Sequence, residues 1–190
     1  ANFPSKAQAE AIAEQLARIG YNSLRFHHFD QIILDRNAGN SVTFDPAKLD
    51  LLDYFFAECK KRGIYITIDL YATRETVPGE IPEIPGKLTM QAYKGAVQVL
   101  DSARRNWEQF TANLLNHVNP HTGLAWKDDP ALYLVCLLNE GNLYLTWNTR
   151  PELKAAVQEK FEKWLADQPT QPADEQQRSI AFNHFLTGMQ

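Results

Sequence analysis

The strongest constraint on the fold is an alternation of helix-like and strand-like segments along the chain. In the helix-like segments apolar residues recur at helical spacing, whereas the strand-like segments are short and rich in β-branched and aromatic residues. The expected helices span residues 5–20, 45–63, about 107–119, 151–166 and 174–187, and the expected strands span residues 21–29, 63–71 and 132–139. This alternation predicts an α/β fold with a parallel sheet whose strands are covered by helices on both faces.

Capping signals indicate where several of these helices begin. Ser5 and Gln8 form a capping box, and Asp45 followed by Pro46 is an N-cap with proline at the first helical position. Thr149 is the expected cap of the helix at residues 151–166. The buried stripe of the first helix is expected to consist of Ile12, Leu16 and Ile19.

Composition and charge argue against several classes of partner. The chain has 190 residues, 44% of them hydrophobic, and a formal net charge of −4, which gives no electrostatic reason to bind nucleic acid. No apolar run approaches the roughly 20 residues that span a bilayer, so no membrane contact is expected. There is no phosphate-binding loop and no metal-ligand spacing, and we expect no cofactor. Cys59 and Cys136 lie in apolar patterns and are expected to be free, packed thiols.

Polar side chains gather at the carboxyl end of each expected strand. Residues 25–30 close the first strand, residues 69–71 close the second, and Asn139 with Glu140 closes the third. Parallel α/β sheets bind their ligands at this edge. Because buried polar groups are costly unless they share a polar environment, the three strand ends predict one polar cavity.

These strand ends resemble one known family. The segments RFHH at 25–28, IDLY at 68–71 and LLNE at 137–140 are similar to strands two, three and four of the clan A glycoside hydrolases, especially the family 5 cellulase-like (β/α)8 barrels. The resemblance implies that Glu140 is the general acid/base, that Asn139 binds the sugar 2-hydroxyl and that Arg25 steadies the nucleophile. Many members have Asp-x-His at the end of strand three, where this chain has Asp69, Leu70 and Tyr71.

Elementary chemistry supports a catalytic role for Glu140 and leaves one alternative. Cleavage of a glycosidic bond needs a carboxylic acid that protonates the leaving oxygen and a second carboxylate, about 5 to 5.5 Å away in retaining enzymes. A glutamate at the end of a buried strand is expected to be partly desolvated, the environment that suits a general acid at neutral pH. The alternative is that Glu140 caps the next helix or lies in solvent.

Other strand-end residues allow two roles each. Neighbouring strand residues point to opposite faces, so His27 and His28 are not expected to face one site, whereas Arg25 and His27 share a face. Each histidine is either a substrate contact or a structural side chain, with the substrate role favoured for His27. Asp30 either binds sugar hydroxyls or caps a loop. Asp69 either contacts substrate together with Tyr71, which shares its face, or pairs with Arg25 in the interior.

Aromatic residues and one long loop complete the expected site. The loop at residues 71–90 is long for a parallel sheet, and its apolar residues Ile81, Ile84 and Leu88 predict that it packs on the protein. The aromatic residues expected to stack on sugar rings are Trp126, Tyr144 and above all Trp147, each with plain packing as the alternative. Trp107 and Trp164 lie on helical stripes and are expected in the core.

The sequence therefore predicts one partial catalytic barrel over residues 1–190. Strand one, which should precede the first helix where only residues 1–3 remain, and strands five to eight are expected to be absent. We expect a piece of a longer retaining glycoside hydrolase that acts on β-linked glycans but lacks its nucleophile and is inactive alone. The alternatives are a carbohydrate-binding or scaffold barrel without chemistry, and an open α/β module that binds another ligand. Exposed sheet edges predict self-association, and the resemblance suggests a secreted or periplasmic protein.

Overall fold

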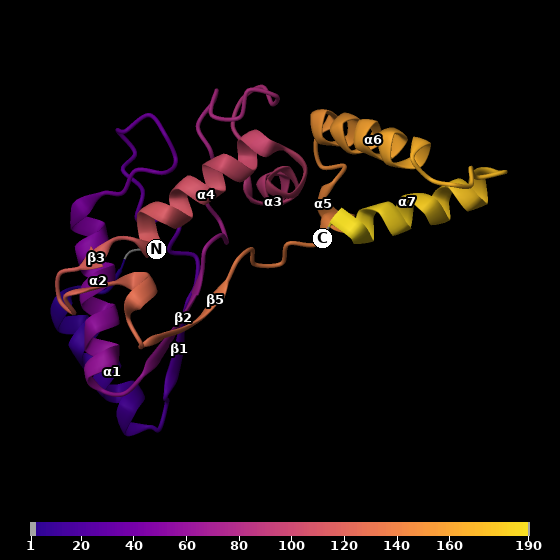
Figure 1. The fold of residues 1–190 in the computed structure, drawn as a ribbon. Coiled ribbons are helices and arrows are strands. Elements are labelled where there is room, and N and C mark those ends of the chain that lie inside the picture. Colours follow the sequence, from indigo (N-terminus) through magenta and orange to yellow (C-terminus); the bar gives the residue numbers. More distant parts are fainter. Residues whose placement is uncertain (1–2, 190) are drawn as a thin grey trace.

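A computed structural model describes residues 3–189, which form an α/β fold around a small parallel sheet (Figure 1). Strands β1 (Ser23–Phe26), β2 (Tyr65–Asp69) and β5 (Leu132–Cys136) pair in the order β1-β2-β5, and both pairings are parallel. The helices are α1 (Lys6–Arg18), α2 (Pro46–Lys61), α3 (Met90–Val99), α4 (Asp101–Leu115), α5 (Leu143–Thr146), α6 (Pro151–Ala166) and α7 (Glu175–Met189). A hairpin of β3 (Val118–Asn119) and β4 (Leu124–Ala125) and a 3-10 turn (Trp126–Asp128) precede β5. The predicted parallel sheet with flanking helices is confirmed, and the partial barrel stays a prediction.

Two of the three predicted helix caps are confirmed. Ser5 forms the capping box with Gln8, and the Asp45 carboxylate accepts hydrogen bonds from the backbone N–H groups of residues 47 and 48, directly before Pro46. Thr149 is not the cap of α6. Arg150 occupies that position, and the Thr149 hydroxyl instead donates to the carbonyl of Thr146 at 2.8 Å.

Helix α3 is the longest of the elements that the sequence pattern did not predict, which also include the hairpin of β3 and β4 and the short helix α5. Seven of its ten residues are buried, including Lys94, which lies on a polar stripe with Gln91 and Gln98. Its N-cap residue, Thr89, makes no side-chain hydrogen bond, and Gly95 lies in its interior. Val118, which was expected to end the following helix, lies in β3 instead.

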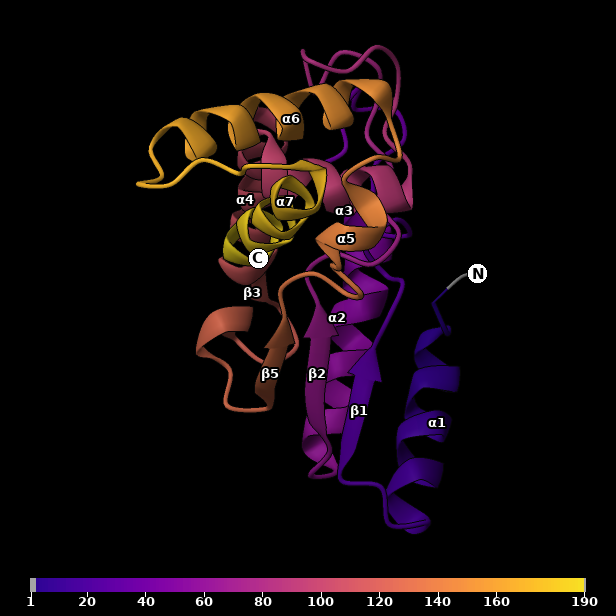
Figure 2. The same cartoon turned by 90° about the vertical axis from the view of Figure 1, so that its right-hand side faces the viewer.

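The sheet is covered by helices on one face only, which corrects the expectation of two covered faces. Helices α1 and α2 lie against the face to which Ile66 and Ile68 of β2 point, and both isoleucines are fully buried there. Figure 2 looks onto the opposite face, over which no helix of residues 3–189 lies. At the edge of this sheet, Tyr133, Leu134 and the following Leu137 are exposed. The described part of the chain therefore leaves one sheet face and the β5 edge accessible.

The buried face of α1 differs from the predicted stripe. Ala9 and Ala13 are the buried residues and lie on the side that packs against α2, while Ile12 and Ile19 are 41% and 58% exposed. Alanine has the smallest side chain that still favours a helix, so it allows two helices to approach closely. Leu16, on the predicted stripe, is half-buried against the first hydrophobic core, which lies between the sheet and helices α1 and α2.

A second hydrophobic core lies beyond the carboxyl end of the sheet, among α3, α5, α6 and α7 (Figure 1). The loop at residues 71–90 contributes Ile81, Ile84 and Leu88 to it, as predicted. Both cysteines are free, Cys59 in the first core and Cys136 at the end of β5. Among the described residues, no helix combines the length and the apolar character that crossing a bilayer demands. The second core fixes the helices that surround the strand ends.

Candidate active site

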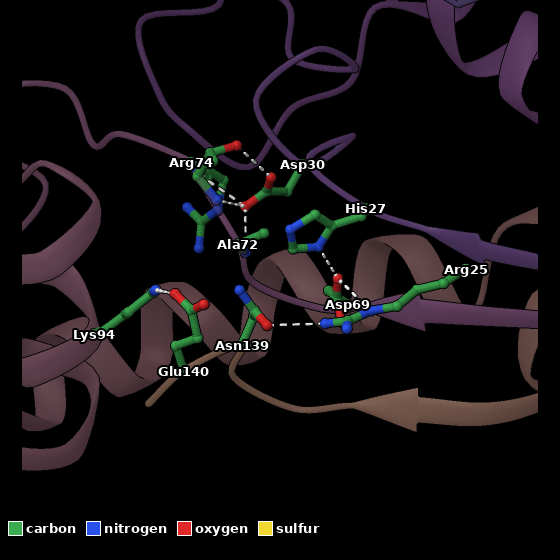
Figure 3. A network of polar contacts seen from close by, with 10 residues as sticks. Arg25, His27, Asp30, Asp69, Ala72, Arg74, Lys94, Asn139 and Glu140 are labelled. Atoms are coloured by element: carbon green, nitrogen blue, oxygen red, sulfur yellow. Dashed lines mark hydrogen bonds and ion pairs between the residues drawn. The ribbon is translucent and has the colours of Figure 1, made fainter. Parts of the chain in front are cut away.

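A buried carboxylate organises the strand ends. The Asp69 side chain, at the end of β2, is fully buried and accepts hydrogen bonds from Arg25, with the Arg25 Nη2 to Asp69 Oδ1 distance 2.7 Å. Arg25 Nε lies 3.1 Å from each oxygen of the same carboxylate, and His27 Nδ1 contacts Oδ2. The parallel register places β1 and β2 so that these three side chains meet (Figure 3). Of the two roles open for Asp69, the structure shows the interior partner of Arg25.

The pKa of Asp69 is set by opposing effects. Burial acts to raise it, but the hydrogen bonds from Arg25 and His27 outweigh burial, and the net pKa lies below its ordinary value. The same hydrogen bond raises the pKa of Arg25. Asp69 is therefore a stable anion that fixes one cation and one imidazole at the strand ends.

Asn139 extends this network to the third strand end. Its Oδ1 accepts a hydrogen bond from Arg25 Nη2 at 2.8 Å, and its backbone N–H donates to the carbonyl of Tyr71 at 2.9 Å. The Nδ2 group makes no hydrogen bond within residues 3–189. Since Oδ1 is engaged by a cation, the amide presents Nδ2 as a donor to a ligand.

Glu140 occupies the turn between β5 and α5 and has a left-handed backbone conformation, with φ of 53°. Its side chain is 75% exposed, so the expected desolvation is wrong. It does not cap α5 either, because Asn142 fills that position and accepts from the backbone N–H of Tyr144. The partner of the Glu140 carboxylate within residues 3–189 is Lys94 of α3, with 3.5 Å between Nζ and Oε2 (Figure 3).

Lys94 is the residue of this region that the sequence did not reveal. Its side chain is fully buried, yet its amine reaches the exposed Glu140. A lysine inside an apolar helix is unusual because burial of a charge is costly. A charged residue among apolar neighbours was the one sequence signal that could have pointed to Lys94. That signal can be recognised only once the helix around Lys94 has been predicted.

The two histidines contradict the alternation argument. β1 ends at Phe26, and His28 has φ of 59°, so the chain turns immediately after the strand. The rings of His27 and His28 therefore lie side by side, with centroids 3.7 Å apart. His27 is held by Asp69, and both imidazoles are exposed enough to meet a ligand.

Asp30 and Tyr71 are not positioned to contact a ligand. Asp30 is fully buried and accepts hydrogen bonds from the backbone N–H groups of Ala72, Thr73 and Arg74, each at 2.8 Å, which is the loop-capping role. Tyr71 is fully buried in the second core, where its hydroxyl donates to the carbonyl of Arg74 at 2.6 Å. The chain leaves the strand at Asp69, so Tyr71 does not continue the face that Asp69 occupies.

The aromatic candidates are mostly packed. Trp126 is buried, and its indole donates to Asp53 at 2.8 Å, so it is not a stacking surface. Trp147 packs edge-on against Phe182 of α7, with centroids 5.1 Å apart, and is half-buried. Tyr144 is partly exposed, and its hydroxyl is engaged by α7. Trp107 and Trp164, expected in the core, are half-buried against it.

No family model matches the chain, and no curated protein matches it. Solved structures do match. An endo-1,4-β-mannanase from Rhizomucor miehei superposes with a TM-score of 0.53 and 14% identity, over 88% of this chain and 51% of that structure. An endo-β-1,4-mannanase from Thermotoga petrophila has a TM-score of 0.49 and 18% identity, over 89% of this chain and 39% of that structure. A family 5 mannosidase from Rhizomucor miehei has a TM-score of 0.47 and 16% identity, over 67% of this chain and 37% of that structure. The chain spans about half or less of each of these three structures.

The chain shares its fold with a glycoside hydrolase. At this identity the likeness concerns the fold alone, and it confirms at that level the resemblance seen at the strand ends. The Rhizomucor miehei structure with the TM-score of 0.53 is an endo-1,4-β-mannanase, and the cellulase-like part of the resemblance stays a prediction.

The lowered pKa of Asp69 predicts a pH dependence of stability. A carboxyl whose pKa is lower in the folded state contributes stability above its unfolded pKa and loses it as the pH falls through the folded pKa. We expect the free energy of unfolding to fall between about pH 5 and pH 2, and the fall to be shallower in Asp69→Asn. Urea titrations at several pH values across this range measure the free energy of unfolding. The control is Asp128→Asn, which changes an exposed carboxylate. Equal slopes for Asp69→Asn and the unaltered chain would refute the assignment.

Proposed function

We propose that this chain carries the acid/base and sugar-binding side of a retaining glycoside hydrolase site for β-linked glycans. One observation carries the proposal: Arg25, Asp69 and Asn139 come from three strand ends and form one continuous hydrogen-bonded row, next to the exposed Glu140 (Figure 3). Two residues of this row, Arg25 and Asn139, and the neighbouring Glu140 are the ones to which the family resemblance gives a role.

The arrangement gives each residue a chemical task. Asp69 fixes Arg25, and Arg25 fixes the amide of Asn139, so Nδ2 is oriented to donate to a sugar hydroxyl before any sugar arrives. Glu140 follows Asn139 directly, and its exposed carboxyl group is accessible to a glycosidic oxygen. It would act as the general acid when the bond breaks and as the general base when water attacks.

The proposed substrate class is a β-1,4-linked mannan or a related β-glycan. Its support is the fold shared with the Rhizomucor miehei endo-1,4-β-mannanase. A retaining mechanism also needs a nucleophilic carboxylate about 5 to 5.5 Å from the acid/base. Within residues 3–189, the side chain that pairs with Glu140 is a lysine rather than a carboxylate. We therefore propose that the nucleophile comes from outside residues 1–190.

A non-catalytic carbohydrate-binding protein is the second candidate. The observation that favours it is the ion pair with Lys94, which engages Glu140 in the absence of a carboxylate partner. Such a protein would use Arg25, Asn139 and His27 to hold a glycan without cleaving it. The kinetics of Glu140→Ala separate the two candidates.

The first test is binding without turnover. We expect the 190-residue chain to bind β-1,4-mannotetraose and to leave it intact, because the attacking carboxylate is supplied elsewhere. Asn139→Ala should weaken binding by roughly threefold to tenfold, the value of one hydrogen bond. Titration calorimetry measures the affinity, and chromatography of the sugar measures cleavage.

The matched control is Asn37→Ala, an exposed asparagine in the loop before α2 that should leave the affinity unchanged. Equal weakening by both substitutions would contradict the role of Asn139. Release of shorter oligosaccharides by the pure chain would contradict the external nucleophile.

A further inference from the structure

Lys94 is a fully buried cation whose amine contacts the carboxylate of an exposed residue, Glu140. Its side chain is fully buried in α3, and its Nζ lies 3.5 Å from Glu140 Oε2. The neighbouring α3 residues, including Tyr93, Ala96 and Val97, belong to the second hydrophobic core. Because an unpaired charge in such surroundings is costly, Lys94 favours conformations in which the Glu140 carboxylate lies beside it.

Helix α3 also holds the backbone of the same turn. Gln98 Nε2 donates to the carbonyl of Gly141 at 3.2 Å and to the carbonyl of Lys94 at 3.0 Å. Gly95 lies so close to α5 that an added Cβ would approach the carbonyl oxygen of Thr146 to 2.8 Å. The helix is therefore fixed against both ends of the segment that follows Glu140.

The geometry points to Lys94 as the positioning residue of Glu140. The backbone of Glu140 is held by α3 and by its own turn, but its side chain is largely exposed and would otherwise sample several rotamers. Pairing with the buried amine selects the rotamer that aims the carboxylate toward α3. The importance of this orientation for catalysis rests on the proposed function. The restraint of the Glu140 side chain by Lys94 does not depend on that function.

Side-chain NMR tests the restraint without any sugar. The χ1 scalar couplings of Glu140 should report one dominant rotamer in the unaltered chain and averaged rotamers in Lys94→Met, which keeps the length and apolar stem but removes the charge. Lys94→Arg should restore the single rotamer. Lys163→Met removes an exposed lysine paired with Glu159 on α6 and should leave the Glu140 couplings unchanged. Averaged couplings in the unaltered chain, or unchanged couplings in Lys94→Met, would overturn the inference.

Two further measurements separate positioning from a purely structural role. We expect Lys94→Met to keep a melting temperature close to that of the unaltered chain, since the carboxylate that loses its partner belongs to the exposed Glu140 and is solvated by water. The affinity for β-1,4-mannotetraose should fall, and Lys94→Arg should recover it. A lowered melting temperature with unchanged couplings and affinity would mark Lys94 as structural and overturn the inference. If Lys94→Met does not fold, the same couplings and affinity are measured in Lys94→Gln, which also removes the charge. If the unaltered chain does not bind the sugar, the proposed function fails, and the couplings still decide the role of Lys94.

Discussion

Replacement of Asp30 by alanine is expected to lower the free energy of unfolding by about 3–5 kcal/mol, because each buried donor left without an acceptor costs roughly 1–3 kcal/mol. The Asp30 Oδ2 atom accepts three consecutive backbone N–H groups, from Ala72, Thr73 and Arg74, and Oδ1 accepts from the Thr73 hydroxyl. Two of these backbone contacts are fully buried, so water cannot replace the carboxylate. The loop that follows β2 would lose the group that fixes its path.

Asp30→Asn is the matched control. An asparagine whose amide oxygen takes the place of Oδ2 keeps all three backbone hydrogen bonds, and its amide can donate to the Thr73 hydroxyl. We expect it to lose much less stability than Asp30→Ala, whose melting temperature should fall by roughly 10 °C. Calorimetry of both variants measures the difference. Similar melting temperatures for the two variants would show that the hydrogen bonds to the loop do not carry the stability.

Replacement of Glu140 by alanine is expected to slow the hydrolysis of glycosides with poor leaving groups by about a hundredfold to ten-thousandfold, the usual contribution of general acid–base catalysis. The measurement needs an active protein that joins residues 1–190 to the nucleophile. Activated aryl glycosides should be affected much less, because their leaving groups depart without protonation. Azide should restore turnover with these substrates and give a β-glycosyl azide, since it attacks the intermediate without a base.

The pattern of loss distinguishes the roles open to Glu140. Equal loss across all leaving groups, with no rescue by azide, would indicate a nucleophilic or structural role. Unchanged kinetics, or no turnover by the unaltered protein on any β-glycoside, would favour the carbohydrate-binding alternative. Glu159→Ala, an exposed glutamate on α6, is the control and should leave the kinetics unchanged.

Local features of the fold could be predicted from the sequence because they depend on neighbouring residues. The caps at Ser5 and Asp45 and the three strands were predicted, since a cap is made within four residues and a strand shows its own composition. Helix α3 was missed because it has only ten residues, with Gly95 in its interior, so its apolar pattern covers about three turns. A pattern that short gives little periodic signal.

The sequence by itself determined that polar residues gather at the ends of three parallel strands, because strand boundaries and polar residues can both be recognised from neighbouring positions in the chain. Only the tertiary structure decided which of them face one another. In the tertiary structure Arg25 is hydrogen-bonded to both Asp69 and Asn139, and Asp30 is buried. Glu140 lies beside Lys94, a residue 46 positions earlier in a different element. The physical reason is that periodicity specifies which side of an element is buried, whereas the partner it meets depends on how distant segments pack.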